Sequence, residues 1–417
     1  RDRCICVSYV FLLSSFTSLW HFTTLTRCPD LVDHIGLGTA GTRQDRLCRC
    51  RWSRSAKGCQ KYILCSTLTV LPHFQGPLRR ELVSYSFAIT GLCGGKAKMK
   101  IICILPLVFC SLLATASNGF ARSYYVKPDG NDTFDGTSDR TAWRTLDKVN
   151  SFGFSTGDDV YFKSGGTWRG KALTVDWAGG PSDRANIGAY YVENGKEIHG
   201  VIGTRPIIDG NNKVPSNTFR GLIDVQTPYV RIENIIVQGS NGEGIDFRDR
   251  GDNGWVNNCL IRDAWRRGVD FSDVDNGVLE HSEITNVDNF GNGAMVRGVR
   301  SNGTIIRYNH IHESAGWSEA VNALHSDNMQ IIGNVIYDTW ANGIYLDHAV
   351  APIVKYNIVY YTRNKKYWRR PSAPFFGIWI ADEKSQGTHH LGRDQVIMYN
   401  FIASTGSNFK LTRNSTT

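Results

Sequence analysis

The C-terminal half of this 417-residue chain repeats a short pattern at nearly constant spacing. An Asn before a short apolar run recurs, with Ser282 as one substitute: Asn234, Asn258, Ser282, Asn309, Asn334, Asn357 and Asn400. The steps between them are 24, 24, 27, 25, 23 and 43 residues. A second series keeps the same step, with Gly-Ile-Asp-Phe at 244–247, Gly-Val-Asp-Phe at 268–271 and related runs from Gly343 and Gly377. Two short apolar runs per repeat leave no room for a helix, so the repeat is predicted to consist of strands.

A repeat of this length can form one coil of three short strands. Coils stacked about 4.8 Å apart share parallel sheets, and equivalent residues then lie on one another. The sequence therefore predicts an all-β fold, a single-stranded parallel β-helix (a solenoid) with rungs of about 24 residues. The recurring Asn are interpreted as a structural amide ladder at a turn. Leucine-rich repeats would need a leucine framework, and propeller blades need a longer period.

The two ends of the predicted solenoid differ. Residues 143–149 form a short amphipathic pattern, which predicts an N-terminal capping helix. Strands are predicted over 159–163, 186–191 and 206–210. At the other end a rung begins at Asn400, a strand is expected at 408–411, and no capping element follows. We therefore expect the C-terminus to be truncated.

The first part of this region carries a recognisable set of residues. They are Tyr124-Tyr125-Val126, Asp129-Gly130-Asn131-Asp132, Gly136-Thr137, Ala142-Trp143, Gly157-Asp158-Asp159-Val160, Gly166-Thr167-Trp168 and Pro206-Ile207-Ile208-Asp209-Gly210. With them, the sequence resembles secreted bacterial right-handed β-helix proteins of the pectate-lyase-like superfamily. The resemblance covers 123–417 and implies a right-handed helix; many such proteins are polysaccharide lyases, epimerases or glycoside hydrolases. It assigns no catalytic residue, because no motif of a particular lyase family is present and fold does not fix function.

The N-terminal segment has a different composition. Ten of the 11 Cys lie at or before Cys110, and residues 1–98 hold 14 basic and 5 acidic side chains, which accounts for the whole net charge of +9. Met99 opens a basic, then apolar, then small-residue stretch over 99–121 that is typical of a secretory signal peptide. We expect residues 1–98 to be a non-native or disordered upstream segment, 122–417 to be the β-helix domain, and the mature protein to be secreted. A Cys-rich domain or metal site in 1–98 is the weaker alternative, because paired CxxC spacing is absent.

Three Asp residues form a candidate metal site. Asp246 and Asp270 occupy equivalent places in the second series and should point outward one rung apart, with Asp273 close by. Like charges so close either share a proton or hold a cation, and Ca²⁺ is the cofactor this predicts. The alternative is an exposed acidic face bridged by arginines: Arg248, Arg266 or Arg267.

Histidines form the candidate catalytic group. His325 and His348 are both at the fifth position from their strand starts, so they should stack, with Asp347 adjacent to His348. A histidine beside a carboxylate can act as a base near neutral pH. Turn histidines bonded to backbone are the alternative. Arg300 is a further candidate catalytic residue, and Arg297 a candidate for binding a sugar carboxylate. His310 and His312 flank an inward Ile311, so one of them is expected to face outward.

The step from Asn357 to Asn400 is about one rung too long because of two insertions, 364–371 and 382–390. The first insertion carries the candidate substrate-binding residues Lys366, Tyr367, Trp368 and Arg369. Cations and aromatic rings together suit an acidic sugar polymer. The alternative is a loop that only packs Trp368 against the solenoid wall.

The leading functional hypothesis is a secreted polysaccharide lyase that cleaves a uronate-containing polymer by β-elimination. Such a reaction needs a neutralised substrate carboxylate, through Ca²⁺ or Arg, and a base for the neighbouring proton. The alternatives are a glycoside hydrolase with two outward carboxylates and a non-catalytic, adhesive β-helix that binds glycan. We expect a monomer that binds an acidic polysaccharide and not nucleic acid, because residues 99–417 have balanced charge, and we expect no membrane span in the mature form.

Overall fold

A computed structural model describes residues 121–288, 293–314, 316, 318–368, 374–383 and 391–413. It also describes the backbone of four strands in the first segment: β1 (Ile5–Val10), β2 (Phe22–Arg27), β3 (Cys65–Leu68) and β4 (Tyr85–Ala88). The chain divides into two compact units, Arg1–Thr115 and Ala116–Thr417. In the first unit β1 pairs with β2 and β3 with β4, both antiparallel. Nearly all of the predicted signal peptide lies outside the described residues, and the origin of 1–98 stays a prediction.

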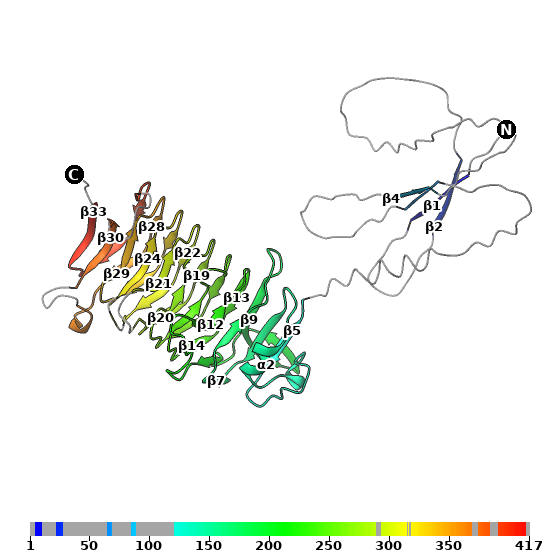
Figure 1. Ribbon diagram of the computed structural model, residues 1–417, viewed down its shortest axis with the longest axis horizontal. Helices are drawn as coiled ribbons and strands as arrows, with labels where there is room; N and C mark the ends of the chain where they lie inside the picture. The colour runs from blue at the N-terminus through cyan, green and yellow to red at the C-terminus, as the bar shows by residue number, and fades with distance from the viewer. Residues whose placement is uncertain are drawn as a thin grey trace, which may run out of the picture. The chain divides into compact units, whose positions relative to one another are not determined.

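The second unit consists of three parallel sheets that share one axis (Figure 1). Sheet 1 contains β5 (Ser123–Val126), β6 (Asp159–Lys163), β9 (Ala185–Glu193), β13 (Val230–Glu233), β16 (Trp255–Asn257), β19 (Val278–Glu280), β22 (Ile305–Arg307), β25 (Gln330–Ile332), β28 (Ile353–Lys355) and β31 (Val396–Met398), with β10 (Lys196–His199) antiparallel to β9. Sheet 2 contains β7 (Thr167–Arg169), β11 (Ile207–Asp209), β14 (Ile236–Gln238), β17 (Leu260–Arg262), β20 (Glu283–Thr285), β23 (His310–His312), β26 (Val335–Tyr337), β29 (Ile358–Tyr360) and β32 (Phe401–Ala403). Sheet 3 contains β8 (Leu173–Val175), β12 (Gly221–Val225), β15 (Glu243–Asp246), β18 (Val269–Asp270), β21 (Gly293–Val299), β24 (Ser318–Leu324), β27 (Ile344–Asp347), β30 (Phe376–Asp382) and β33 (Ser407–Arg413).

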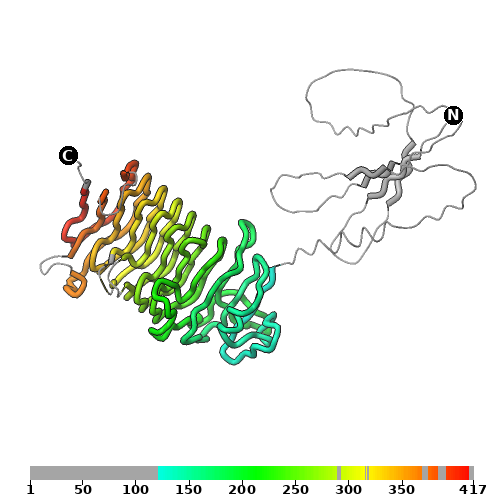
Figure 2. The backbone as a smooth tube through the Cα atoms, viewed as in Figure 1, coloured from blue at the N-terminus to red at the C-terminus, as the bar shows by residue number. Residues whose placement is uncertain are grey.

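From β6 onward, and apart from the hairpin strand β10, successive strands belong to successive sheets, so the backbone winds as a continuous coil (Figure 2). The predicted parallel β-helix is therefore confirmed. Equivalent apolar residues of successive rungs stack inside it, and in sheet 1 they are fully buried: Ile232, Val256, Leu279, Ile306, Ile331 and Val354. Each such side chain contributes about 1.5–3 kcal/mol through burial. The single cysteine of this unit, Cys259, is a buried free thiol, so the core and the ladder hydrogen bonds stabilise the fold.

The predicted amide ladder is present at the turn from sheet 1 to sheet 2. The Nδ2 of Asn309 donates to the Oδ1 of Asn334 at 3.0 Å, and Asn334 donates to Asn357 at 3.0 Å. All three side chains are buried. The earlier part of the predicted series was wrong by one position. Asn234 and Asn258 occupy the preceding residue of the turn, where φ is 61° and 49°, because Asn tolerates this left-handed conformation.

The N-terminal end is capped as predicted. The capping helix is α2 (Leu146–Ser151), preceded by a short 3₁₀ turn, η1 (Asp139–Thr141). Leu146 and Val149 form its buried face, and the helix contacts β8 of the first rung. The ring of Trp143, just before the helix, stacks on Tyr124 of β5 at 5.0 Å. Aromatic packing thus closes this end of the core.

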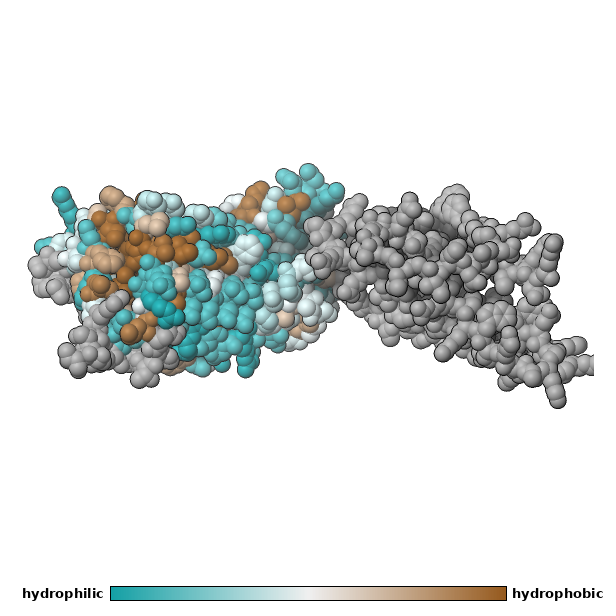
Figure 3. Space-filling model, turned by 90° about the horizontal axis from the view of Figure 1, so that it is seen from above, coloured by the Kyte–Doolittle hydropathy of each residue, from teal (hydrophilic) through white to brown (hydrophobic). Residues whose placement is uncertain are grey.

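The outer surface of sheet 1 is apolar towards the C-terminal end of the solenoid (Figure 3). Outward residues there include Val278, Ile305, Ile353 and Val396, which lie in register. In the described part of the chain, no helix is long and apolar enough to cross a membrane.

Candidate functional site

The outward face of sheet 3 carries one side chain per rung in register. We call these residues the sheet-3 row: Asp224, Asp246, Asp270, Arg297, Asn322, Tyr345, Trp379 and Lys410. Strand alternation produces the row, because the neighbours of each member point into the core; Ile245 and Phe247, for example, are fully buried. Asp246 and Asp270 therefore lie one rung apart, as predicted.

Three residues after each member of the row, the chain turns towards sheet 1. We call the residues at this place the turn row: Asp249, Asp273, Arg300, His325 and His348, with φ of 67°, 57°, 52°, 50° and 53°. The centroids of the His325 and His348 rings are 4.8 Å apart, so the predicted histidine stack is present. Three predicted catalytic residues, Arg300, His325 and His348, thus occupy consecutive rungs on one edge of sheet 3.

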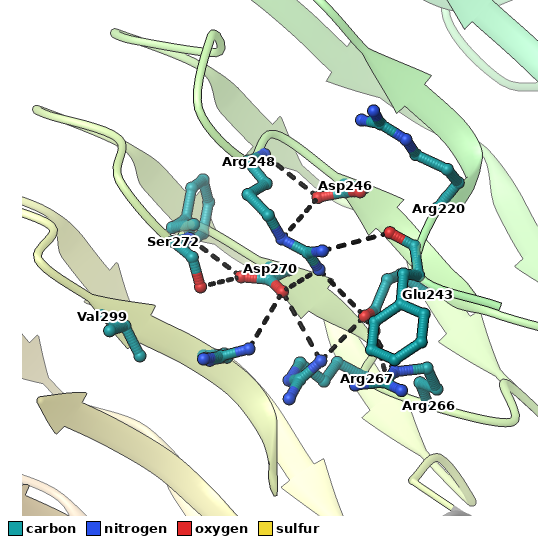
Figure 4. A network of polar contacts seen from close by, with 12 residues as sticks. Arg220, Glu243, Asp246, Arg248, Arg266, Arg267, Asp270, Ser272 and Val299 are labelled. Atoms are coloured by element: carbon teal, nitrogen blue, oxygen red, sulfur yellow. Dashed lines mark hydrogen bonds and ion pairs between the residues drawn. The ribbon is translucent and has the colours of Figure 1, made fainter. Parts of the chain in front are cut away.

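At the acidic end of the sheet-3 row, carboxylates and guanidinium groups form a buried network (Figure 4). Arg248 is central to it: one Nη2 lies 2.7 Å from Oδ2 of Asp270 and 3.1 Å from Oε1 of Glu243. Arg267 lies 2.8 Å from the same Glu243 oxygen. Asp246 accepts a hydrogen bond from the backbone N–H of Arg248 at 3.0 Å. The network fixes the conformation of side chains that would otherwise extend into solvent.

The calcium site stays a prediction, and its three Asp residues all lie beside arginines. Ca²⁺ takes six to eight oxygen ligands, whereas the predicted ligands face arginines. Asp270 is approached by Arg248 and also by Arg297, whose Nη1 is 3.8 Å away. Asp273 accepts two hydrogen bonds from Arg300, one of 2.6 Å from Nη2 to Oδ2. Arginine bridging, the alternative reading of this face, is what the structure contains, although Asp246 and Asp270 are fully buried rather than exposed.

The two central carboxyl groups have opposite pKa shifts. Burial and the neighbouring Asp270 carboxylate raise the pKa of Asp246 to about 7. Burial would also raise the pKa of Asp270, but Arg267, Arg297 and Arg248 outweigh it and lower that pKa. The Oδ2 of Asp246 is buried without a hydrogen-bond partner. Below about pH 7, a protonated Asp246 therefore lies beside an ionised Asp270.

A second polar group lies on the rung that contains β27. The hydroxyl of Tyr345 donates to Oδ2 of Asp347 at 3.2 Å, and Nδ1 of His348 lies 2.8 Å from the other carboxylate oxygen. The backbone N–H of Glu383 also donates to Asp347 at 3.0 Å. Asp382 is near enough that its carboxylate, Asp347 and His348 each present a ligand atom within 4.8 Å of the others. The Asp347 carboxylate therefore contacts both the Tyr345 phenol and the His348 imidazole, and the His325 ring lies beside them.

Tyr345 is a proton donor in this group. Burial, followed by the charges of Asp347 and Glu383, raises the pKa of Tyr345, so its hydroxyl stays protonated at neutral pH. Sequence reasoning missed this residue, although Tyr345 occupies the same place in its rung as Asp246 and Asp270. A full alignment of the second repeat series would have identified it, together with Asn322.

The insertion loop lies at the other edge of sheet 3 from the histidines, because it follows β29 of sheet 2. Its described part contains η2 (Lys365–Tyr367) and Trp368. Tyr367 is buried and donates to Glu313 at 3.4 Å, while Nε1 of Trp368 donates to a backbone carbonyl at 3.3 Å. Tyr367 is therefore packed against the solenoid, Trp368 is half-buried and bonds the carbonyl of Thr362, and Lys366 is exposed. Arg369 and most of the second insertion lie outside the described residues.

The comparisons with known proteins give one family match. Residues 250–416 match the model of the right-handed β-helix region. Among curated proteins, no match was found.

Several solved structures are similar in part. The alginate lyase from Paenibacillus sp. str. FPU-7 is 13% identical, with 70% of this chain and 99% of that chain covered and a TM-score of 0.44. XylC in complex with xylose is 10% identical, with 70% of each chain covered and a TM-score of 0.49. The Streptococcus pneumoniae surface adhesin PfbA is 11% identical, with 62% and 73% covered and a TM-score of 0.41. The matched region and the three continuous parallel sheets identify the second unit of this chain as a right-handed parallel β-helix.

Proposed function

We propose that this chain is a carbohydrate-active enzyme that cleaves a uronate-containing polysaccharide by β-elimination. The observation that supports the proposal is the hydrogen-bonded group of Tyr345, Asp347 and His348 beside His325. It places a phenol, a carboxylate and two imidazoles on adjacent rungs at one edge of sheet 3. In general chemistry, an imidazole can accept a proton from a substrate and a phenol can donate one.

β-Elimination requires two proton transfers. A base removes the proton on the carbon next to the sugar carboxylate, the C–H electron pair forms the new double bond, and the bond to the glycosidic oxygen breaks. An acid then protonates that oxygen. We assign the base to the imidazole pair, His325 and His348, and the acid to Tyr345, whose raised pKa keeps its proton in place.

The substrate carboxylate must also be neutralised, since its charge opposes removal of the neighbouring proton. Arg297 is in register with Asn322 on the adjacent rung, and Arg300 is one place before His325 in the turn row. Arg297 is 3.8 Å from Asp270 and can bind a substrate carboxylate in addition. Arg300 bonds Asp273 through Nε and Nη2, so a substrate carboxylate would bind its remaining Nη1 or replace Asp273. Of the two means of neutralisation that the sequence suggested, Ca²⁺ or Arg, this proposal uses Arg.

The rest of the sheet-3 row suits a long ligand that runs along the solenoid axis. Beyond Tyr345 the next members are Trp379, whose ring centroid is 5.0 Å from that of Tyr345, and Lys410, whose Nζ is 3.9 Å from the Trp379 ring. An aromatic face can stack on a sugar ring, and the ammonium can attract a sugar carboxylate. Successive rungs about 4.8 Å apart give a repeated surface for a repeated polymer.

A lyase assay tests this function directly. The chain is incubated with pectate, alginate or a glycosaminoglycan, and the absorbance of the unsaturated product is followed. We expect Tyr345→Phe and His348→Asn to lower kcat by roughly 100-fold or more, and His281→Asn, on a different corner of the solenoid, to leave it unchanged. A chelator should not slow the reaction. The proposal is wrong if Tyr345→Phe retains full turnover, or if no acidic polymer yields unsaturated product.

A glycoside hydrolase is the second candidate, and the Asp246–Asp270 pair favours it. One carboxyl group with a raised pKa beside one with a lowered pKa is an arrangement that can supply a general acid and its partner. Both groups are fully buried, so a substrate would need the covering residues to move. New reducing ends without product absorbance, abolished by Asp246→Asn, would select this reaction over elimination.

A further inference from the structure

A cluster of side chains of the types that can ligate a metal ion lies on sheet 2, away from the proposed active site. Strand alternation places His310 and His312 of β23 on the same outward face, on either side of the buried Ile311. Glu283 of β20 is in register with His310 on the preceding rung. Both histidines thus face outward, where the sequence had predicted one.

The three side chains converge. Their potential ligand atoms all lie within 4.8 Å of one another. The Nε2 of His312 is 3.3 Å from Oε1 of Glu283. Two ligand atoms bound at zinc distances in a tetrahedral centre are about 3.3 Å apart, so this pair already has the separation that a metal ion would require.

The surroundings orient the central imidazole. The other ring nitrogen of His312, Nδ1, lies 3.1 Å from Oε2 of Glu313. The ring of Tyr337 stacks on the imidazole with a centroid separation of 4.7 Å and an interplanar angle of 8°. A carboxylate behind a metal-bound histidine selects the tautomer and raises the basicity of the ligand nitrogen. These contacts direct Nε2 of His312 towards Glu283.

A cavity opens beside the cluster. It has a volume of about 340 Å³, and both Glu283 and His310 contribute to its wall. Arg205 and Tyr308 line it too. An ion held by the three side chains would therefore have one coordination position on the cavity side, with a guanidinium group available to a negatively charged ligand.

We propose that Glu283, His310 and His312 form a binding site for a divalent transition-metal ion such as Zn²⁺, with an open position towards the cavity. Two imidazoles and one carboxylate suit zinc, cobalt or nickel rather than Ca²⁺ or Mg²⁺, which prefer oxygen ligands. The site belongs to sheet 2, whereas Tyr345 and its partners belong to sheet 3. The proposal is therefore independent of the lyase activity.

Metal titration of the full chain tests the site. The thiols are first alkylated, because ten of the 11 cysteines lie at or before Cys110 and thiolates bind zinc. Zn²⁺ is added to metal-free protein and the heat of binding is recorded; Co²⁺ is added separately, and its visible absorption reports the coordination geometry. We expect a tight site with the spectrum of a tetrahedral nitrogen–oxygen centre, and no comparable binding of Ca²⁺.

Variants assign the ligands. His310→Asn and His312→Asn should each weaken Zn²⁺ binding at least tenfold, and Glu283→Gln should weaken it as well. His281→Asn borders the same cavity but lies outside the ligand set, so it should bind like the parent. His310 is exposed, so its replacement should leave the thermal unfolding of the metal-free protein unchanged.

The other cluster of the described residues, Asp347, His348 and Asp382, provides the decisive comparison. Loss of Zn²⁺ binding in His348→Asn but not in His310→Asn would overturn the proposal. So would the absence of any Zn²⁺ binding by the folded parent.

Discussion

At the scale of single residues, Asp246 is an acid whose ionisation the fold alters strongly. Its pKa is raised from 3.8 to about 7 by burial and by Asp270. The folded state therefore binds the proton more tightly than the unfolded state. The stabilisation is complete below the unfolded pKa and is lost as the pH rises through about 7.

Asp246→Asn should reveal this linkage. Asn cannot ionise, so the variant avoids the cost of a buried charge at high pH. We expect the melting temperature of the variant, relative to the parent, to be higher at pH 9 than at pH 5. Thermal unfolding at the two pH values measures the difference, and other titrating groups cancel because both proteins share them. A relative melting temperature that falls with pH would contradict the raised pKa.

Residues of the site were predictable where the repeat fixes their place. Counting from strand starts was enough to stack His325 on His348 and Asp246 beside Asp270. The arginines were harder, because a long flexible side chain can lie along several directions from one backbone position. The sequence suggested Arg248 as one of three possible bridging arginines, but it did not show that this side chain bends over both Asp270 and Glu243.

At the scale of elements, the turn from sheet 1 to sheet 2 depends on the amide ladder. Each buried Asn bonds the next rung, and the Nδ2 of Asn334 also donates to the backbone carbonyl of Ile306 at 2.9 Å. Asn334→Leu would leave polar groups of its neighbours buried and unpaired. We expect a loss of about 1–3 kcal/mol in the free energy of unfolding, measured by denaturant unfolding.

The matched control for that variant is Asn258→Gly. Asn258 belongs to the same kind of turn but occupies the left-handed position before the ladder, where Gly is tolerated without strain. Its side chain is only partly buried and bonds Asn234 and Arg205, so its replacement removes hydrogen bonds without leaving fully buried groups unpaired and should cost less than Asn334→Leu. Equal losses for the two variants would mean that the ladder contributes nothing specific. The sequence did not separate these two turn positions, because Asn is favoured at both for different reasons.

The insertion loop provides a second prediction for an element. Lys365 and Lys366 are exposed, whereas Tyr367 is buried against the solenoid. If the loop borders the substrate path, Lys365→Ala with Lys366→Ala should raise KM for an acidic polymer and leave kcat and the melting temperature unchanged. The difference from the parent should shrink at high salt, since exposed charges are screened. An unchanged KM at low salt would mean that the loop does not contact the substrate and only packs against the solenoid.

At the scale of the whole molecule, the fold was predictable because the same pattern of apolar and turn residues recurs in the sequence once per rung. Each rung contacts only its neighbours, so a local period determines the global architecture. The capping helix α2 was predictable because the first rung has no neighbour on one side, and its exposed apolar end requires a cover. The contacts of the candidate site were not predictable. Core packing restricts which residues can occupy the inward positions of each rung, but it does not restrict the outward positions in the same way.

The same nearest-neighbour logic predicts that a chain beginning at Arg122 folds by itself. The first strand, β5, pairs with β6, and the backbone N–H of Arg122 donates to Asp158 at 2.8 Å. All contacts of the first rung described above lie within 122–417. We expect a β-rich circular dichroism spectrum and the same cooperative thermal transition as the full chain.

A chain that begins at Lys127 is the control for this deletion. It lacks β5 and with it the buried Tyr124, Tyr125 and Val126, so Trp143 loses the stacked ring of Tyr124 at the capped end. Its melting temperature should fall below that of the chain that begins at Arg122. If the Arg122 chain itself fails to fold while the full chain does, residues before 122 contribute to the fold, and the interpretation of 1–98 as an upstream segment is wrong.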